Sequence, residues 1–334
     1  MPRFLFITLF CLIGLNATAT ETVRVSAVTA PGTPWHDGWL HFEEALKGQP
    51  ELLQPVFYLG GQLGSEEMAL SQLRRGRIQM GGFSLQGASS VVPELGILMS
   101  PYLFDSLDEV DFTMDKYLLE AFDKLFAAKG LVLLSWAEVG WTSLYASTPL
   151  LSPADTAGLK LRSSNALASQ LLVQSIGADM IPLTFADIMP SLQTGLIQGG
   201  ESGAIFYALT GLPREAPYLT LTRHAFDTGM YLANRDWYLG LSAAAQQHLA
   251  SSLMPAASFR QLLRSYEARI LAAPQNYGIE LLQPTPQQLL QWRNATMDNR
   301  NQLAELIGGS SEQVLRLLQQ AKQDFSARRP ATGL

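Results

Sequence analysis

Two short polar segments follow candidate strands and contain the side chains best suited to holding a small molecule. Arg162 ends the predicted strand 159–162 and is followed by a polar run that includes Asn165, and a second polar run, 198–202, follows the predicted strand 196–198. Open α/β sheets bind their ligands at the carboxyl ends of strands. An arginine there offers a planar fork of donors that suits a carboxylate. The pattern predicts an anion site at Arg162, with an ordinary surface ion pair as the alternative.

Aromatic side chains recur at or near predicted loop and strand ends, and they suggest apolar walls for such a site. Each of them alone is more often a core residue than a ligand contact. Several at matching ends would suit a ligand with an apolar body. The residues are Trp35, Trp136, Trp141, Phe185 and Phe206.

Catalytic and metal-binding patterns are not found. His36 and His41 lie five residues apart and the other two histidines are distant, so no pair has the spacing of helical metal ligands. The sequence has no G-x-S-x-G elbow, P-loop or G-x-G-x-x-G motif. Adjacent carboxylates such as Glu66 and Glu67 are interpreted as solvated residues of a helix's first turn. We therefore expect a protein that is not an enzyme and that has no cofactor and no metal site.

Charge and length narrow the class further. The 334 residues carry a formal net charge of −6 and few clustered basic side chains, which argues against a nucleic-acid partner. The length suits two domains. Residues 1–19 combine Arg3, an apolar run and an Ala-Thr-Ala site, and are predicted to be a cleaved signal peptide that exports the protein to the periplasm; a retained anchor is the alternative. Cys11, the single cysteine, lies within that segment, so the mature chain would have no disulfide.

Helical and strand patterns alternate along most of the chain, which favours an α/β class with largely parallel pairing. A helix opening at Thr184 and closed by Gly195 contains Pro190, which is expected to kink it. From Ser242 onward helices dominate. The predicted strands are 22–28, 56–59, 78–83, 159–162, 196–198 and 279–282, and the predicted helices include 35–46, 165–176 and 256–273.

The segment 152–162 resembles the signature "pDlkGlKiR" of the DctP-like extracytoplasmic receptors of TRAP transporters. Four other segments resemble motifs of that family in order and spacing, so the resemblance covers nearly the whole mature chain. They are 61–64, 76–80, 98–104 and 185–195.

The resemblance implies a two-domain periplasmic binding protein fold, with a mixed, mostly parallel sheet in each domain and helical C-terminal segments. Domain I would comprise 20–139 plus 228–267, and domain II 140–227 plus 268–330. The implied function is to capture a small organic acid between closing domains and deliver it to the TRAP membrane subunits. A ligand-sensing subunit of a signalling receptor is the alternative.

Roles of single residues follow from the same resemblance. The arginine matching Arg162 holds the ligand carboxylate, and Phe185 matches an aromatic that packs on the ligand. Ser202 stands where the "DGqEn" motif has asparagine, and Gly200 where it has glutamine. Thr142 and Ser84 stand where acid-sugar receptors carry arginine and an acid. The expected ligand-binding residues are Arg162, Phe185, Ser202, Trp141, Thr142, Ser84, Asn165, Trp35 and Phe206.

These departures remove strong polar groups, while the aromatic residues remain. A second charge on the ligand would find no partner and would be costly to desolvate. The sequence therefore predicts a monocarboxylate with an apolar body.

Overall fold

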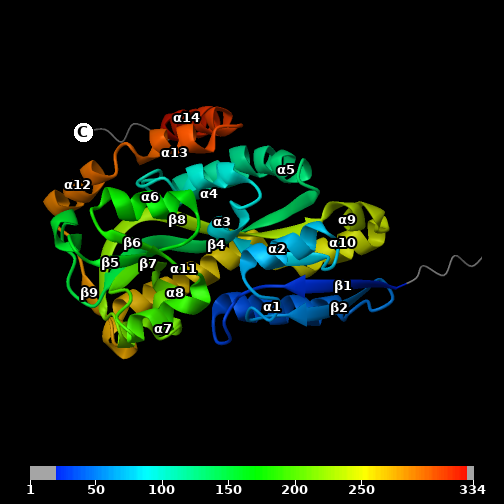
Figure 1. Ribbon diagram of the computed structural model, residues 1–334. Helices are drawn as coiled ribbons and strands as arrows, with labels where there is room; N and C mark the ends of the chain where they lie inside the picture. The colour runs from blue at the N-terminus through cyan, green and yellow to red at the C-terminus, as the bar shows by residue number, and fades with distance from the viewer. Residues whose placement is uncertain (1–19, 329–334) are drawn as a thin grey trace, which may run out of the picture.

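The computed structural model describes residues 20–328. The expected signal peptide 1–19, with Cys11, lies outside the described residues. The described chain is an α/β protein in which helices cover both faces of a mixed sheet (Figure 1). The expected fold class is confirmed, including the helical C-terminal segment.

The strands are β1 Glu21–Ser26, β2 Leu53–Tyr58, β3 Met80–Ser84, β4 Leu131–Ala146, β5 Lys160–Ser163, β6 Asp179–Pro182, β7 Gly199–Gly203, β8 Tyr218–Asn234 and β9 Glu280–Leu282. The α-helices are α1 Pro34–Leu46, α2 Glu66–Arg74, α3 Leu85–Ala88, α4 Leu107–Thr113, α5 Leu119–Ala127, α6 Leu167–Ser175, α7 Ile188–Gln193, α8 Ala204–Leu209, α9 Arg235–Gly240, α10 Ala243–Ser252, α11 Ala256–Ala272, α12 Pro286–Ala295, α13 Asn299–Ile307 and α14 Ser311–Arg328. The short 3-10 helices are η1 Pro93–Met99, η3 Pro153–Thr156, η4 Phe185–Asp187, η5 Leu212–Arg214 and η6 Pro274–Tyr277, and η2 Met114–Leu118 is a π-helical turn.

Two long strands, β4 and β8, join what the sequence suggests are two separate sheets. In the described residues the strand order is β2-β1-β3-β8-β4-β7-β5-β6, with β9 on β8. Pairing is parallel within β2-β1-β3 and within β7-β5-β6, and antiparallel where β4 and β8 take part as neighbours of β3, β7 and each other. We call β1–β3 with their helices the first lobe and β5–β7 with theirs the second lobe. Each lobe thus has its own parallel strands, and β4 and β8 run through both.

The passage from one lobe to the other falls at an irregular point of the β4–β8 ladder. The register shifts between Glu138 and Gly140, opposite Asp227 and Thr228. Residues 142–146 of β4 pair with β7, whereas residues 229–233 of β8 pair with β3. A β-bulge bends a strand and increases its twist, so the sheet changes direction where the lobes meet.

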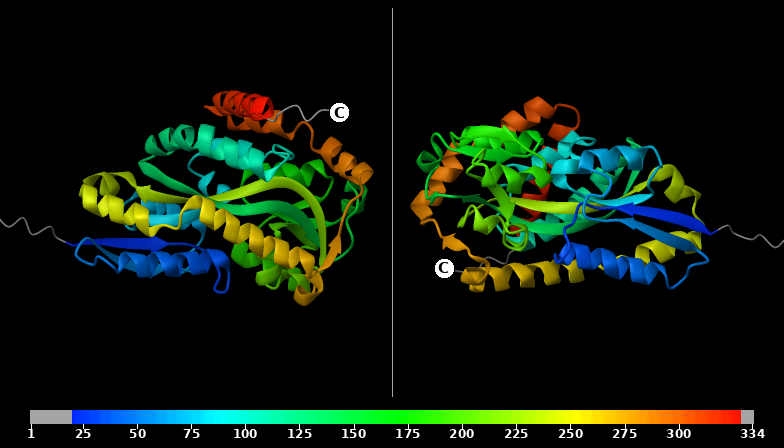
Figure 2. Two further views of the ribbon diagram at one scale, coloured as in Figure 1. Left: turned by 180° about the vertical axis from the view of Figure 1, so that it is seen from behind. Right: turned by 60° about the horizontal axis from the view of Figure 1, so that its bottom comes forward.

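Helices cover the two faces of these strands as strand alternation requires. Trp136 packs in the hydrophobic cluster that contains α5, while its neighbour Ala137 packs in the cluster that contains α8 and α11. Helix α11 runs along one face of the sheet, and α4 and α5 lie on the other (Figure 2). The long helix α11 therefore spans the region where β4 and β8 pass from one lobe to the other.

The last helix packs where the expected division did not place it. Val314 and Leu318 of α14 share a cluster with residues of α4 and η1, which belong to 20–139. Their apolar stripe needs a partner surface, and the surface it covers is that of α4. This packing groups α14 with the first lobe, whereas the expected division placed 268–330 in domain II; the division itself stays a prediction.

Two local expectations, the strand at 196–198 and the kink at Pro190, were wrong. The strand expected at 196–198 lies at 199–203, because the glycines there allow the close approach of β4: a Cβ on Gly199 would lie 2.2 Å from the Tyr145 carbonyl oxygen. The kink expected at Pro190 is replaced by an ordinary start, since α7 begins at Ile188. Proline in the first helical turn removes no helical hydrogen bond.

Candidate functional site

Arg162 lies in β5, near its carboxyl end, as the sequence predicted, and its side chain is buried. Only 6% of the residue is exposed, and its Nε donates a hydrogen bond to the Leu183 carbonyl oxygen at 3.1 Å. Within residues 20–328 it forms no ion pair. Burial lowers the pKa of Arg162, while the nearby Tyr145, Glu201 and Glu66 oppose that shift, and a guanidinium remains protonated regardless. A buried cation with no carboxylate partner among the described residues is the main feature of the site.

Glu66 lies near Arg162 and belongs to the first lobe. It opens α2, and its carboxylate accepts hydrogen bonds from the Ser84 backbone N–H at 2.8 Å and the Ser84 hydroxyl at 2.6 Å. Burial raises the pKa of Glu66, and the hydrogen bonds from Ser84 and the charge of Arg162 oppose the rise. The interpretation of Glu66 as a solvated first-turn residue was wrong. Ser84 stands where acid-sugar receptors are expected to carry an acid, and here the Glu66 carboxylate is hydrogen-bonded to it.

A buried polar network supports the segment after Arg162. The Ser164 N–H donates to Ser169 Oγ at 2.9 Å, Ser169 donates to one oxygen of Glu201, and His224 Nε2 lies 3.1 Å from the other. Burial alone would raise the pKa of Glu201, but the hydrogen bonds from His224 and Ser169 lower it overall. Both Glu201 oxygens are thus engaged inside the protein and leave Arg162 without a carboxylate partner.

Asp227 is a second buried carboxyl group that the sequence did not single out. Its Oδ1 is buried and has no hydrogen-bond partner in the described residues. Burial raises the pKa of Asp227 to about 8, and the negative charges of Glu201 and Glu66 add to the rise. Asp227 is therefore mostly protonated at neutral pH. No sequence signal marks it, because its surroundings come from strands far apart in the chain.

Three of the predicted aromatic residues contact one another. Trp35 of α1 stacks on Phe206 of α8 with centroids 4.3 Å apart and an interplanar angle of 8°, and the Trp35 indole N–H donates to the Glu138 carbonyl oxygen at 2.9 Å. Phe185 meets Phe206 edge-on at 5.5 Å and is 40% exposed. The stacking distance leaves no room for a ligand ring between Trp35 and Phe206, so Phe185 is the member of this group that presents a free surface.

Of the remaining predicted residues, Trp141 and Thr142 lie on β4, Ser202 lies on β7, and Asn165 follows β5. Trp141 packs edge-on against Phe226 with centroids 5.2 Å apart. Thr142 is buried and faces Gly203 in the β4–β7 ladder, next to Ser202, whose hydroxyl donates to the Gly203 carbonyl oxygen at 3.1 Å. Asn165 is exposed, and no side-chain contact joins it to Arg162.

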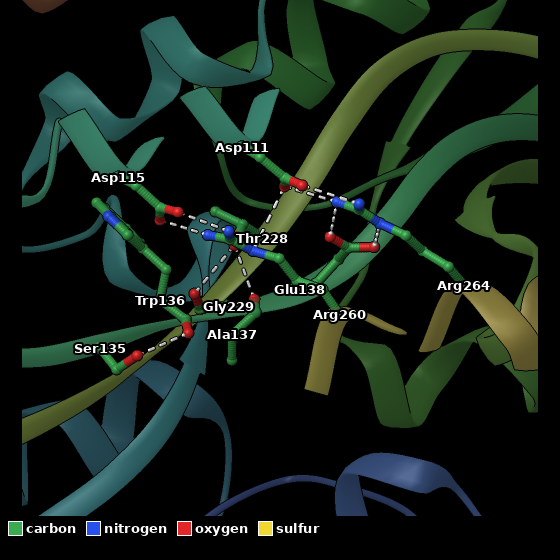
Figure 3. Close-up of polar contacts among 10 residues, drawn as sticks. All are labelled: Asp111, Asp115, Ser135, Trp136, Ala137, Glu138, Thr228, Gly229, Arg260 and Arg264. Carbon is green, nitrogen blue, oxygen red and sulfur yellow. Dashed lines mark hydrogen bonds and ion pairs between the residues drawn. The ribbon is translucent and has the colours of Figure 1, made fainter. Parts of the chain in front are cut away.

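A surface hollow of about 450 Å³ lies elsewhere, away from Arg162. It is lined by α11 and by Asp111 of α4, and its arginines are paired, as Figure 3 shows. Arg264 donates to both Asp111 and Glu138, and Arg260 donates to Asp115. Because these charges are already satisfied, the hollow offers no free cation for an anion.

Two further observations concern only residues 20–328. No group of three or more His, Cys, Asp or Glu side chains is arranged to hold a metal ion there. No helix in that range is long and apolar enough to cross a membrane.

Relatives include a solute-binding protein of Chromohalobacter salexigens, 31% identical over 52% of this chain and 52% of the relative. The ectoine-binding periplasmic protein TeaA of Halomonas elongata is 34% identical over 57% of each chain. The 2,3-diketo-L-gulonate-binding periplasmic protein YiaO of Escherichia coli is 25% identical over 83% of this chain and 86% of that one. The first and second of these matches span little more than half of the relatives' length.

Solved structures show the same fold. The sugar acid binding protein DctPAm of Advenella mimigardefordensis, in complex with galactonate, superposes with a TM-score of 0.83 at 22% identity and covers 90% of this chain and 99% of that chain. A TRAP periplasmic solute binding protein of Anaerococcus prevotii with bound glucuronate gives 0.84 at 20% identity, over 93% and 100%. The family model of the bacterial extracellular solute-binding proteins, family 7, matches residues 25–305. The chain therefore belongs to this family of extracellular solute-binding proteins, the DctP family.

Proposed function

We propose that this protein captures a small organic anion between its two lobes and delivers it to the membrane subunits of a TRAP transporter. The observation that carries the proposal is Arg162, a buried guanidinium whose one hydrogen bond goes to a carbonyl oxygen. A buried charge is stabilised only when it is paired, so a carboxylate brought by the ligand would supply the missing partner. The likeness to TRAP periplasmic proteins supports the transport role, and no observation favours the signalling alternative.

Closure would be a rotation of the lobes about β4 and β8. We place the division at 139/140 and 227/228, where the β4–β8 register shifts, and in this proposal α14 moves with the first lobe. A ligand that contacts both lobes stabilises the closed state by its differential affinity. Arg162 in the second lobe and Glu66 in the first interact electrostatically, so Arg162 lies where the two lobes meet.

The ligand is proposed to be a monocarboxylate. A second ligand carboxylate close to Glu66 would be repelled, because its charge is like that of Glu66. Phe185 offers an exposed ring for an apolar ligand body. Relatives are named for ectoine and for 2,3-diketo-L-gulonate, which fits a small organic acid as the ligand class.

A melting screen with wild type, Arg162→Ala and the surface control Arg316→Ala tests both parts. Aromatic and branched-chain acids, including 2-oxo acids such as 3-methyl-2-oxobutanoate, should raise the melting temperature more than succinate, malate or sialic acid. Arg316, which pairs only with Glu312 on an exposed helix face, should be dispensable. Arg162→Ala should lose the shift, corresponding to about 2–5 kcal/mol of binding free energy.

Different outcomes of this screen have different meanings. A larger shift with C4-dicarboxylates than with any monocarboxylate contradicts the proposed ligand class. Shifts that persist in Arg162→Ala contradict the role of Arg162.

A further inference from the structure

Tyr145 lies at the centre of the sheet and is completely buried. It is 0% exposed, it pairs with Gly200 of β7 and Leu219 of β8, and its ring packs against Tyr207 with centroids 5.3 Å apart. Its side chain belongs to the cluster of the α8 and α11 face. A residue in this position would ordinarily be explained by packing alone.

The hydroxyl group of Tyr145 is not explained by packing. It has no hydrogen-bond partner in the described residues, although burying a hydroxyl without one is unfavourable. The same cluster contains a tyrosine whose hydroxyl is satisfied, since Tyr207 donates to the Ala216 carbonyl oxygen at 2.5 Å. The cluster therefore does not by itself leave tyrosine hydroxyls unpaired.

The unpaired hydroxyl adjoins Arg162. A Cβ built on Gly200 would lie 3.0 Å from the Tyr145 hydroxyl oxygen and 3.2 Å from Arg162 Cβ, so both side chains border the same glycine. Tyr145 also acts electrostatically on Arg162, and burial raises the pKa of Tyr145, so the phenol keeps its proton and is a donor. The nearest carboxylate, Glu201, is engaged by Ser169 and His224 and does not accept this proton.

We propose that Tyr145 is the second donor of the anion site: its hydroxyl donates to the carboxylate that Arg162 holds. The proposal rests on the proposed function, because it needs an anion at Arg162. It explains why residue 200 is glycine, a departure from the family motif noted in the sequence. Any larger side chain there would meet the hydroxyl that the anion requires.

The test is titration calorimetry of Tyr145→Phe with those acids of the screen that stabilise the wild type. Removal of the hydroxyl should lower the affinity about tenfold or more, as expected for a hydrogen bond to a charged acceptor, and leave the melting temperature of the free protein unchanged or higher. Tyr207→Phe is the matched control. It removes a hydroxyl from the same cluster and should leave the affinity unchanged while it lowers stability.

A second arm needs no ligand. Gly200→Ala should lower the melting temperature of the wild type, and lower it less in the Tyr145→Phe background, because the hydroxyl that the new Cβ meets is then absent. Equal losses in both backgrounds contradict the contact on which the proposal is built.

The outcomes separate this proposal from the proposed function. Affinity lost in Arg162→Ala but within twofold of wild type in Tyr145→Phe overturns the role of Tyr145 and leaves the function standing. An equal loss in Tyr145→Phe and Tyr207→Phe also overturns it, since removal of any hydroxyl from this cluster, rather than of a hydrogen bond to the anion, would then explain the effect. If Arg162→Ala binds as the wild type does, the proposed function itself fails.

Discussion

At the scale of single residues, the site combines one unpaired buried cation with carboxyl groups that are satisfied to different degrees. Glu201 is fully engaged by His224 and Ser169, Glu66 is held by Ser84, and Asp227 has an unpartnered oxygen. Carboxyl groups in such different surroundings titrate differently. The electrostatic balance around Arg162 therefore depends on pH through the least satisfied of them.

Asp227 gives a testable pH dependence of stability. Its pKa of about 8 in the folded protein lies above the ordinary aspartate value of 3.8, so the folded state retains a proton that the unfolded state loses. Stability linked to Asp227 is fully present below about pH 4 and is lost as the pH rises toward 8. Asp227→Asn should therefore flatten the decline of the melting temperature between pH 5 and pH 8.

Scanning calorimetry at four pH values measures this directly. The pKa values of Glu66 and Glu138 are also raised in the folded protein. In Asp227→Asn the decline of the melting temperature with pH should therefore become less steep rather than disappear. Identical slopes for wild type and Asp227→Asn would show that Asp227 is ionised in the folded protein.

At the scale of elements, ion pairs between α11, α4 and β4 stabilise the region where β4 passes from one lobe to the other. Arg264 donates to Asp111 and to Glu138, whose side chain is only 4% exposed, while Arg264 is 24% exposed (Figure 3). The Glu138 carbonyl oxygen in turn accepts the indole N–H of Trp35. Glu138 is thus joined to α11 through its side chain and to α1 through its backbone carbonyl group.

Arg264→Ala should destabilise the protein strongly, because it leaves the Glu138 carboxylate buried without its partner. The free energy of unfolding should fall by about 3 kcal/mol. Arg316→Ala, which removes an exposed helical ion pair, should change it by less than about 0.5 kcal/mol. Denaturant titrations of both variants compare them, and the double variant Arg264→Ala/Glu138→Gln should regain part of the loss. Equal stabilities of the two single variants would contradict this account.

How far the elements could be predicted depended on whether their signal was local. Strand β5 and helix α1 were predicted within a residue or two, because capping and glycine stops are local. The strand predicted at 196–198 lies before the observed β7, because a run of glycines indicates a loop unless its close contact with β4 is known. Strands β4 and β8 were not among the predicted strands, because their partners change along their length and alternation within one segment does not reveal such a strand.

The same limit applies to the site. Arg162 was predictable from its place at a strand end, where the family motif also lies. Glu66 was misinterpreted because its contact with Ser84 spans 18 residues of chain. Tyr145 and Asp227 lie on the two crossing strands, and their surroundings exist only once β4 and β8 are paired.

At the scale of the whole molecule, the proposed capture of an anion at Arg162 requires two lobes that move about β4 and β8. Each lobe has its own parallel strands, and only part of the β4–β8 ladder is irregular. Hinge motions of this kind are absorbed by a few residues at element boundaries. In the proposed function, the ligand would supply the driving force for closure through its contacts with both lobes.

Small-angle X-ray scattering of wild type and Arg162→Ala, with and without 3-methyl-2-oxobutanoate or the acid that most raises the wild-type melting temperature, tests capture and closure together. The account predicts that a concentration saturating the wild type lowers its radius of gyration and leaves that of Arg162→Ala unchanged. A wild-type profile unaffected by bound acid, or equal compaction of the variant, would contradict the claim that an anion at Arg162 closes the protein.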